Sequence, residues 1–305
     1  MKAVVLGAAG GGGFPQWNSN AAGCRRARAG DLLALPRTQA SIAISGDGEH
    51  WYLLNAAPDL RQQIGATPEL YPSSLRHNNA TRSTPIAGMI LTGGDVDVIA
   101  GLLSLRERQA FTLYATARIH AVLDANSIFE VLARDVVPRA IMKLDTPVAL
   151  AGGLTVALFA VPGKVPLYLE QDDTMPEIAL DETTVAALVT DGSRRLFYIP
   201  GCAMMTPELA ARLDGADAVF FDGTLWRDDE MVVAGLSAKT GRRMGHMSLS
   251  GADGTIAAFE SIAVKRKIII HINNSNPVLL ADSPERTLAV EAGWTVAEDG
   301  MRIEI

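Results

Sequence analysis

The sequence predicts a single α/β domain with mixed β-sheets, spanning residues 1–305. Three observations support this fold class. Short apolar segments typical of strands alternate with segments typical of helices along most of the chain. No repeat period and no low-complexity linker divides the chain into two parts. With 305 residues, 48% of them hydrophobic, the chain can bury a large core without a disulfide or a structural metal.

In the first half of the chain, apolar runs bounded by turn residues define the expected elements. Gly46-Asp47-Gly48 is a turn signal between two apolar runs, which predicts a hairpin. The strands are expected at Lys2–Leu6, Ser41–Ser45, Trp51–Ala56, Ile86–Leu91 and Thr112–Ala115. The helices are expected at Asp59–Ile64, at Val96–Arg106 and, as one helix or two, at Ala117–Arg134.

The second half continues the alternation with longer apolar runs, which are typical of strands buried on both faces. Strands are expected at Leu154–Val161, Leu196–Ile199, Ala218–Phe221 and Lys267–His271, and helices at Pro207–Leu213 and Pro284–Ala292.

Composition and charge argue against several classes of protein. The formal net charge of −7 disfavours nucleic acid or an anionic membrane as the main partner. Two cysteines, Cys24 and Cys202, are too few for a disulfide-rich secreted scaffold. No apolar run reaches 18 residues, and Val4–Leu6 is too short for a signal sequence. We therefore expect a cytoplasmic protein without membrane insertion. The sequence does not determine the oligomeric state, and a homo-oligomer is possible.

The glycine run near the N-terminus invites comparison with nucleotide-binding loops. Gly7, Gly10 and Gly13 have the required spacing after a strand, but a dinucleotide site needs a helix directly after the glycines. Phe14-Pro15 follows instead, so we expect a turn whose backbone passes close to another part of the molecule.

The loop 92–98 places Asp95 and Asp97 between an apolar strand and a helix. The carboxyl edge of a sheet is the usual place for a ligand in α/β folds, and two close carboxylates can share a divalent cation. The alternative is that these residues serve as an N-cap and a first-turn acid of the helix. On local evidence alone, this structural explanation is favoured.

Three further polar residues end or follow strand-like segments. His271 closes the run Ile268-Ile269-Ile270, and Asp222 follows Val219-Phe220-Phe221. His246 lies in Gly245-His246-Met247, next to a small residue that permits close approach. A histidine after a buried strand is more often a structural group than a ligand, but several such strand ends together indicate a shared pocket.

Longer segments resemble, in order along nearly the whole chain, the coenzyme PQQ synthesis protein B family of the metallo-β-lactamase-fold superfamily. The matching segments are not generic features of the fold, so the resemblance is specific. They are Gly10–Asn18 (GGGGFPQWN), Arg61–Ile64, Gly101–Glu107 (GLLSLRE), Val161–Leu167 (VPGKVPL), Ile199–Cys202 (IPGC), Phe221–Thr224 (FDGT), Gly245–Met247, His271–Pro277 (HINNSNP), Glu291–Thr295 and Asp299–Met301.

This resemblance implies an αβ/βα sandwich of two mixed sheets flanked by helices, with the active site at the edge between them. It implies a role in the biosynthesis of pyrroloquinoline quinone (PQQ), which is built from a glutamate and a tyrosine of a precursor peptide. The implied activity is an Fe(II)-dependent hydroxylation of the tyrosine ring of a cross-linked Glu–Tyr intermediate. The alternative is a non-catalytic carrier that moves PQQ or its precursor towards the periplasm. Either partner is a small, carboxylate-bearing molecule, which suits a bound cation better than an acidic surface.

The metal loop is where this chain departs from the superfamily. The superfamily pattern is His-x-His-x-Asp-His, and Gly93, Asp95, Asp97 and Val98 occupy those positions here. The PQQ family usually keeps the final Asp-His pair, so Val98 removes an expected imidazole.

The other ligand positions that the resemblance implies fall at Gly163 and near Cys202, which leaves His271 as the terminal histidine. We therefore expect no binuclear zinc hydrolase centre and no β-lactamase activity. Family members also commonly carry a Cys-x-Cys-x-x-Cys zinc knuckle, where this chain has Ser19, Ala21 and Cys24. One thiol cannot form a tetrahedral structural zinc site, so none is expected.

Two hypotheses follow for the site. In the first, Asp97 and His271, with Asp95 as a further candidate, hold a weakly bound Fe(II), while Asp222 and His246 complete the catalytic set as orienting groups. In the second, the chain keeps the fold and pocket but binds PQQ or an intermediate without a metal. Val98 favours the second hypothesis, and the retained aspartates and histidines favour the first.

Overall fold

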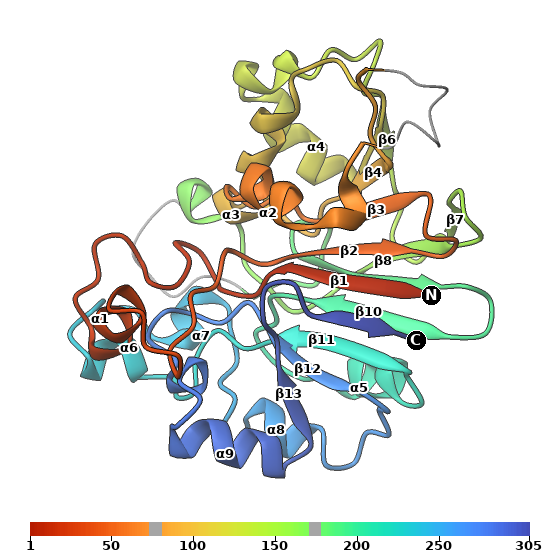
Figure 1. Ribbon diagram of the computed structural model, residues 1–305. Helices are drawn as coiled ribbons and strands as arrows, with labels where there is room; N and C mark the ends of the chain where they lie inside the picture. The colour runs from red at the N-terminus through yellow and green to blue at the C-terminus, as the bar shows by residue number, and fades with distance from the viewer. Residues whose placement is uncertain (73–80, 171–177) are drawn as a thin grey trace.

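The computed structural model describes residues 1–72, 81–170 and 178–305. Within them, two seven-stranded sheets stack on each other, and helices cover their outer faces (Figure 1). Helices α2, α3 and α4 lie on one outer side, and α5, α8 and α9 lie on the other. This architecture confirms the predicted fold class, an αβ/βα sandwich of two mixed sheets.

The first sheet has the strand order β14-β1-β2-β3-β4-β5-β6. The pairings from β14 to β3 are antiparallel, and those from β3 to β6 are parallel. Its strands are β1 (Lys2–Gly7), β2 (Ser41–Ser45), β3 (Trp51–Leu54), β4 (Ile86–Ile90), β5 (Thr112–Ala115), β6 (Arg139–Ile141) and β14 (Arg302–Glu304).

The second sheet has the order β13-β12-β11-β10-β9-β8-β7 and repeats the same pattern. Pairings from β7 to β10 are antiparallel, and those from β10 to β13 are parallel. Its strands are β7 (Val148–Ala149), β8 (Thr155–Ala160), β9 (Val185–Thr190), β10 (Arg195–Ile199), β11 (Ala218–Asp222), β12 (Lys267–Ile270) and β13 (Trp294–Val296).

The helices are short. They are α1 (Ala22–Arg28), α2 (Leu60–Ala66), α3 (Val96–Ile99), α4 (Ala117–Asp124), α5 (Pro207–Leu213), α6 (Glu230–Val233), α7 (Gly241–Met244), α8 (Thr255–Ala258) and α9 (Pro284–Glu291), with 3₁₀ segments at Pro68–Leu70, Ala100–Leu105, Ser127–Val131, Leu167–Leu169 and Pro277–Leu279. In the described parts of the chain, none of these helices has the length and apolarity needed to span a bilayer.

Two apolar clusters hold the layers together. One contains buried residues of both sheets, among them Leu53 and Phe220, and packs the sheets against each other. The other lies between the second sheet and its helices, where the Phe259 ring contacts Phe221 and Trp294 edge to face. Each fully buried aromatic or aliphatic side chain of this kind contributes about 1.5–3 kcal/mol to folding.

One predicted helix is wrong in its extent. The segment expected as a helix at Val96–Arg106 is α3 followed by the 3₁₀ segment Ala100–Leu105. The backbone of Ala56 pairs with this segment, since its N–H donates to the Val98 carbonyl and its carbonyl accepts from Gly101. A β-carbon on Gly101 would lie 2.0 Å from the Ala57 carbonyl oxygen, so this close approach requires glycine. Tertiary contact therefore overrides the local helical preference.

The other expected elements are present with shifted ends, and several were missed. The segment Ala117–Arg134 is α4 plus the 3₁₀ turn Ser127–Val131, and the strand expected at Trp51–Ala56 ends at Leu54. The missed elements include α1, α6 to α8 and the strands β6, β7, β9, β13 and β14. Most of them are four residues or shorter, too short to show a period in the sequence.

The glycine run forms the expected turn. The Gly13 N–H donates to the Gly10 carbonyl, and both Gly12 and Gly13 have positive φ angles, 88° and 71°. The Gly10 N–H also donates to the carbonyl of Ile272, just after β12. This turn thus ties the end of the first sheet to the end of the second, where the site lies.

Candidate active site and metal centre

A cavity of about 450 Å³ lies where the carboxyl ends of strands from both sheets meet. The first sheet supplies the loop after β4, with Asp95 and Asp97 on the cavity wall. The second sheet supplies Gly201 after β10, Thr224 after β11 and His271 after β12. Since parallel strands end at the same edge of a sheet, the topology alone brings these loops together.

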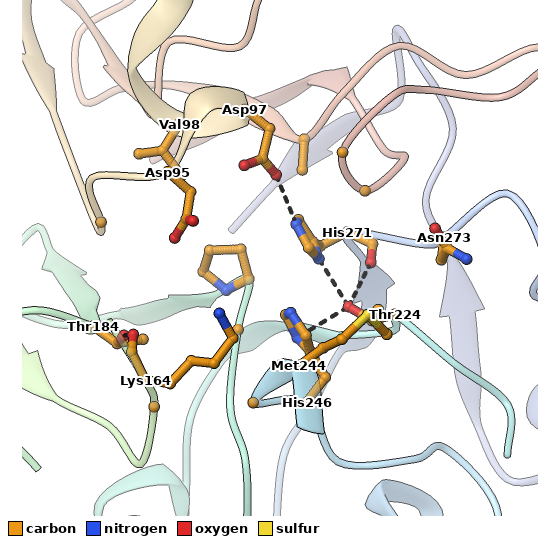
Figure 2. Close-up of a pocket in the computed structure, with 18 of the residues that line it drawn as sticks. Asp95, Asp97, Val98, Lys164, Thr184, Thr224, Met244, His246, His271 and Asn273 are labelled. Atoms are coloured by element: carbon orange, nitrogen blue, oxygen red, sulfur yellow. Dashed lines mark hydrogen bonds and ion pairs between the residues drawn. The ribbon is translucent and has the colours of Figure 1, made fainter. Parts of the chain in front are cut away.

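The structure brings most of the sequence-predicted site residues to this cavity. Gly93, Asp95, Asp97 and Val98, which are predicted to occupy the metal-loop positions, all line it. Figure 2 shows Asp95, Asp97 and Val98 on one side of the pocket, across from His246.

The remaining predicted residues surround the other side. His271, His246 and Gly163 line the cavity, whereas Asp222 is fully buried behind His246. Cys202 is also fully buried, and its thiol donates to the Met204 carbonyl at 3.2 Å. Burial raises the pKa of this thiol far above its ordinary value, so it stays protonated and is a poor metal ligand.

The hydroxyl group of Thr224 is the centre of the hydrogen-bond network. It lies 2.7 Å from Asp222 Oδ1. It also lies 2.9 Å from His271 Nδ1 and 3.1 Å from His246 Nδ1 (Figure 2). An ionised carboxylate only accepts hydrogen bonds, so Thr224 donates its single proton to Asp222. The hydroxyl oxygen can then accept a hydrogen bond from His271 Nδ1–H.

These partners fix the tautomers of both histidines. His246 Nδ1 lies 2.6 Å from Asp222 Oδ2, so it carries the proton and donates it to the carboxylate. With Nδ1 of both rings acting as a donor, Nε2 is the nitrogen left for a metal, although on His271 it carries the proton donated to Asp97 when no metal is bound. The rings of His246 and His271 stack with centroids 5.2 Å apart. Such outer hydrogen bonds orient imidazoles that bind metals.

Asp222 is held as an anion by its surroundings. Besides His246 and Thr224, its carboxylate accepts hydrogen bonds from the backbone N–H groups of Cys202 and Thr224. Burial alone would raise the pKa of this carboxyl group, but the charges and hydrogen bonds of His246, His271 and Thr224 lower it. A buried anion therefore anchors the second-sheet side of the pocket.

Asp97 and His271 form the contact between the two sheets. Asp97 Oδ2 and His271 Nε2 lie 3.0 Å apart. Burial acts against both charges, yet the mutual attraction lowers the pKa of Asp97 and raises that of His271. Asp95 occupies the N-cap position of α3 without a capping hydrogen bond from its side chain, and Asp97 faces His271. The acidic pair thus has the predicted helix-start positions, since Asp97 lies in the first turn of α3, and Asp97 in addition contacts His271.

The backbone of His271 is unusual. Its φ angle is 58°, in the left-handed region that residues other than glycine seldom adopt. The next residue pairs with the chain after β1, since the Ile272 N–H donates to the Ala8 carbonyl. The surrounding structure holds this conformation, and such local strain is concentrated at functional sites.

The donor atoms fit a divalent cation. Among the described residues, Asp222, His246 and His271 form a group with ligand atoms within 4.8 Å of one another. Thr224 Oγ1 fills the Nδ1 side of this group, so a cation fits on the Nε2 side, where Asp97 reaches His271. Two ligands at about 2.1 Å from one cation lie about 3 Å apart when their bonds meet at a right angle. The 3.0 Å between Asp97 Oδ2 and His271 Nε2 therefore admits a cation in place of the proton that joins these two atoms.

Several residues of the pocket were missed by sequence reasoning. Thr224 lies within the matched segment FDGT, but nothing in the sequence marks its hydroxyl as the shared partner of three side chains. Lys164, Glu170 and Arg243 also line the cavity. Lys164 lies in the matched segment VPGKVPL, but no short motif links it and Glu170 to Arg243, which is distant in the sequence.

Comparisons with known proteins agree with this geometry. The family model described as "Beta-lactamase superfamily domain" matches residues 50–272. Coenzyme PQQ synthesis protein B from Gluconacetobacter diazotrophicus is 62% identical over 98% of both chains, and that from Methylorubrum populi is 52% identical over all of both. The chain belongs to the coenzyme PQQ synthesis protein B family.

A solved member of the coenzyme PQQ synthesis protein B family shares the whole fold. The crystal structure of Zn²⁺-bound PqqB from Methylobacterium extorquens covers all of both chains at 51% identity with a TM-score of 0.96. Family membership confirms the predicted pathway, the synthesis of PQQ. Together with the Zn²⁺ in that relative, the group Asp222, His246 and His271 supports metal binding at this edge.

Proposed function

We propose that this chain is an Fe(II)-dependent hydroxylase of PQQ synthesis, acting on the tyrosine ring of a cross-linked Glu–Tyr intermediate. The observation that carries the proposal is the convergence of Asp97 Oδ2 and His271 Nε2, 3.0 Å apart, on a cavity of about 450 Å³. Asp95 on the same wall adds a second carboxylate. A small set of carboxylate and imidazole ligands suits iron and leaves positions for other molecules.

The residues of the chain have distinct roles in this proposal. Asp97 and His271 would hold the metal, with Asp95 beside them, and a bound ferrous ion would supply the redox chemistry with dioxygen that ring hydroxylation needs. Thr224 and Asp222 hold the imidazoles in the tautomers that expose Nε2. His246 Nε2 can accept the proton of a phenol hydroxyl, because Asp222 stabilises the resulting imidazolium ion.

A second candidate function is a carrier that binds PQQ or its precursor without turnover. The observation that favours it is the presence of Gly93 and Val98 on the cavity wall, where neither supplies a donor atom. Tight metal binding generally needs three or four good protein ligands, so this site would hold a metal weakly. A carrier would keep the pocket and its shape without the need for a tightly held ion.

Anaerobic Fe(II) titration followed by an oxygen-uptake assay tests both functions. Insertion of one oxygen atom consumes O₂ and two external electrons and releases water, so the assay contains ascorbate as reductant. With the cross-linked Glu–Tyr compound, the hydroxylase proposal predicts oxygen uptake and a product heavier by one oxygen atom in mass spectrometry. Asp97→Asn and His271→Gln should abolish both signals.

His50→Gln is the matched control, because His50 pairs with Asp47 on the surface and does not line the cavity. It should leave oxygen uptake unchanged. Binding of the compound without oxygen uptake in the iron-loaded wild type would establish the carrier instead. Failure to bind Fe(II) at all would refute the hydroxylase.

A further inference from the structure

A cluster of four charged side chains occupies the pocket wall away from Asp97. Glu170 lies between three cations: Lys164 Nζ is 2.8 Å from Oε1, while Arg243 Nη2 and Lys239 Nζ are 2.8 and 4.0 Å from Oε2. All four residues line the same cavity as Asp97 and His271. In Figure 2 Lys164 points into the pocket from the side across from Asp97. One carboxylate is thus shared among three positive charges.

The cations of this cluster lie in a confined space. The side chains of Lys164 and Arg243 are only 13% and 9% exposed, although such residues normally extend into water. Hydrogen bonds from Arg243 and Lys164 lower the pKa of Glu170 to about 2, so it carries its negative charge at neutral pH. The carboxylates Asp95 and Asp97 line the wall across the pocket, so the cations are gathered on this side. Cations on one wall of a concave site attract the anionic part of a ligand.

The cluster is built into the framework that positions the metal edge. Arg243 lies on α7, and Gly245, with a φ angle of 83°, ends this helix and turns the chain towards His246. A β-carbon on Gly245 would lie 3.0 Å from Lys164 Cγ, so the stem of Lys164 packs directly on this turn. The same short segment therefore places one cation of the cluster and one imidazole of the site.

A second connection fixes the cluster relative to the metal loop. Tyr168, between Lys164 and Glu170 in the sequence, donates its hydroxyl proton to the Gly94 carbonyl at 2.6 Å. Thr184 donates to the Lys164 carbonyl at 2.9 Å. The spacing between the cations and Asp97 is thus set by the fold before any ligand enters.

We infer that Lys164, Lys239 and Arg243 form a carboxylate subsite for an aromatic polycarboxylate whose ring lies towards Asp97 and His271. This assignment rests on the proposed function for the identity of the reacting ring, but not for the binding of the anion. Guanidinium and ammonium groups bind carboxylates through short, charge-assisted hydrogen bonds. Glu170 holds the cations in place and limits the affinity by competing for them, which lets the product leave.

Calorimetric titration of the metal-free chain with PQQ, a tricarboxylate, tests the subsite. Lys164→Met keeps the apolar stem and should weaken binding about tenfold or more, the value of one charge-assisted hydrogen bond. Glu170→Gln removes the competing negative charge and should tighten binding. Lys265→Met is the control, since Lys265 is 76% exposed, pairs with Asp217 and does not line the cavity, so affinity should not change.

The opposite signs of the two effects make the test decisive. If Lys164→Met and Glu170→Gln both weaken binding, the cluster is only structural and the subsite is refuted. The same conclusion follows if the affinities of both variants for PQQ stay within about twofold of the wild-type affinity. Lys239→Gln, at a more exposed side chain, replaces Lys164→Met if that variant does not fold, and should also weaken binding. Oxygen uptake is measured separately: its absence with the predicted binding pattern intact refutes the hydroxylase and leaves the subsite standing.

Discussion

The two edges that face each other across the pocket have the same strand pattern but different chemistry. In each sheet, three antiparallel pairings are followed by three parallel ones, and the site residues follow the parallel strands. The second-sheet edge is a connected network around Asp222 and Thr224. The first-sheet edge offers Asp95 and Asp97 at the start of α3, and Asp97 contacts the network through His271.

This difference shows which edge tolerates substitution. Removal of a group from the network leaves several buried partners unsatisfied, which is costly. A change at Val98, in the first turn of α3, alters the pocket wall without breaking a hydrogen bond of the network. The predicted replacement of a superfamily histidine by Val98 is thus compatible with an intact opposite edge.

The largest effect is expected for Asp222→Ala. The variant leaves the backbone N–H groups of Cys202 and Thr224 and the His246 ring without their acceptor. We expect it to lower the free energy of unfolding by about 3–5 kcal/mol. Asp95→Ala, at the other edge, should cost less than about 1 kcal/mol. Urea denaturation of the metal-free proteins measures both, and equal losses would contradict the contrast between the edges.

The contact between the edges predicts a pH dependence for Asp97→Asn. Asp97 has a lowered pKa, so its contribution to stability is present above the ordinary value of 3.8 and is lost as the pH falls through the lowered value. His271 has a raised pKa, so its contribution is present below 6.5 and is lost as the pH rises through the raised value.

Without metal, the wild type should therefore exceed Asp97→Asn in unfolding free energy by about 1.5–3 kcal/mol between these pH limits. This difference in unfolding free energy should become smaller as the pH falls through the lowered pKa of Asp97 and as it rises through the raised pKa of His271. Denaturation series at several pH values measure this difference, with Asp229→Asn as control because Asp229 pairs with the exposed Arg227 on the surface. A gap that does not depend on pH would show that the pair is not ionic.

Val98→His tests whether the first-sheet edge can be completed. The Val98 side chain already lines the pocket next to the acidic loop, so an imidazole there would add a donor. We expect Fe(II) affinity to rise at least about tenfold, since even outer hydrogen-bond partners of ligands are worth about 10–100-fold. Val98→Leu is the size control. Anaerobic titration without a gain for histidine would show that the superfamily pattern is aligned incorrectly with this loop.

The smallest effect is expected outside both edges, at Cys24. Its thiol is buried in α1 and lies 3.6 Å from Asn274 Oδ1, while Arg25 and Arg28 hold the preceding turn through the carbonyls of Asn20 and Ser19. We expect Cys24→Ser to leave the zinc content of purified protein unchanged. Metal analysis before and after chelation measures this, and stoichiometric zinc that disappears in the variant would overturn the expectation.

The sequence predicted much of the fold and the general location of the site, for physical reasons that differ by residue. Apolar runs such as Ile268–Ile270 make strands wherever they are buried, and the polar residue after such a run reaches the edge. His271 and Asp222 could therefore be expected near one another. The position of Glu170 between Arg243 and Lys164 could not be expected from the sequence. Glu170 is 73 positions from Arg243, and only the fold brings the two together.

The pairing of β1 with β14 has a consequence for how the protein is made. Val4 pairs with Arg302 across almost the whole length of the chain. During synthesis, one side of β1 therefore exposes unpaired backbone groups until β14 leaves the ribosome. Such open strand edges invite association with other chains, and contacts so distant in sequence slow folding. Truncation of β14 should accordingly reduce the soluble yield in cells more than its three residues alone would suggest.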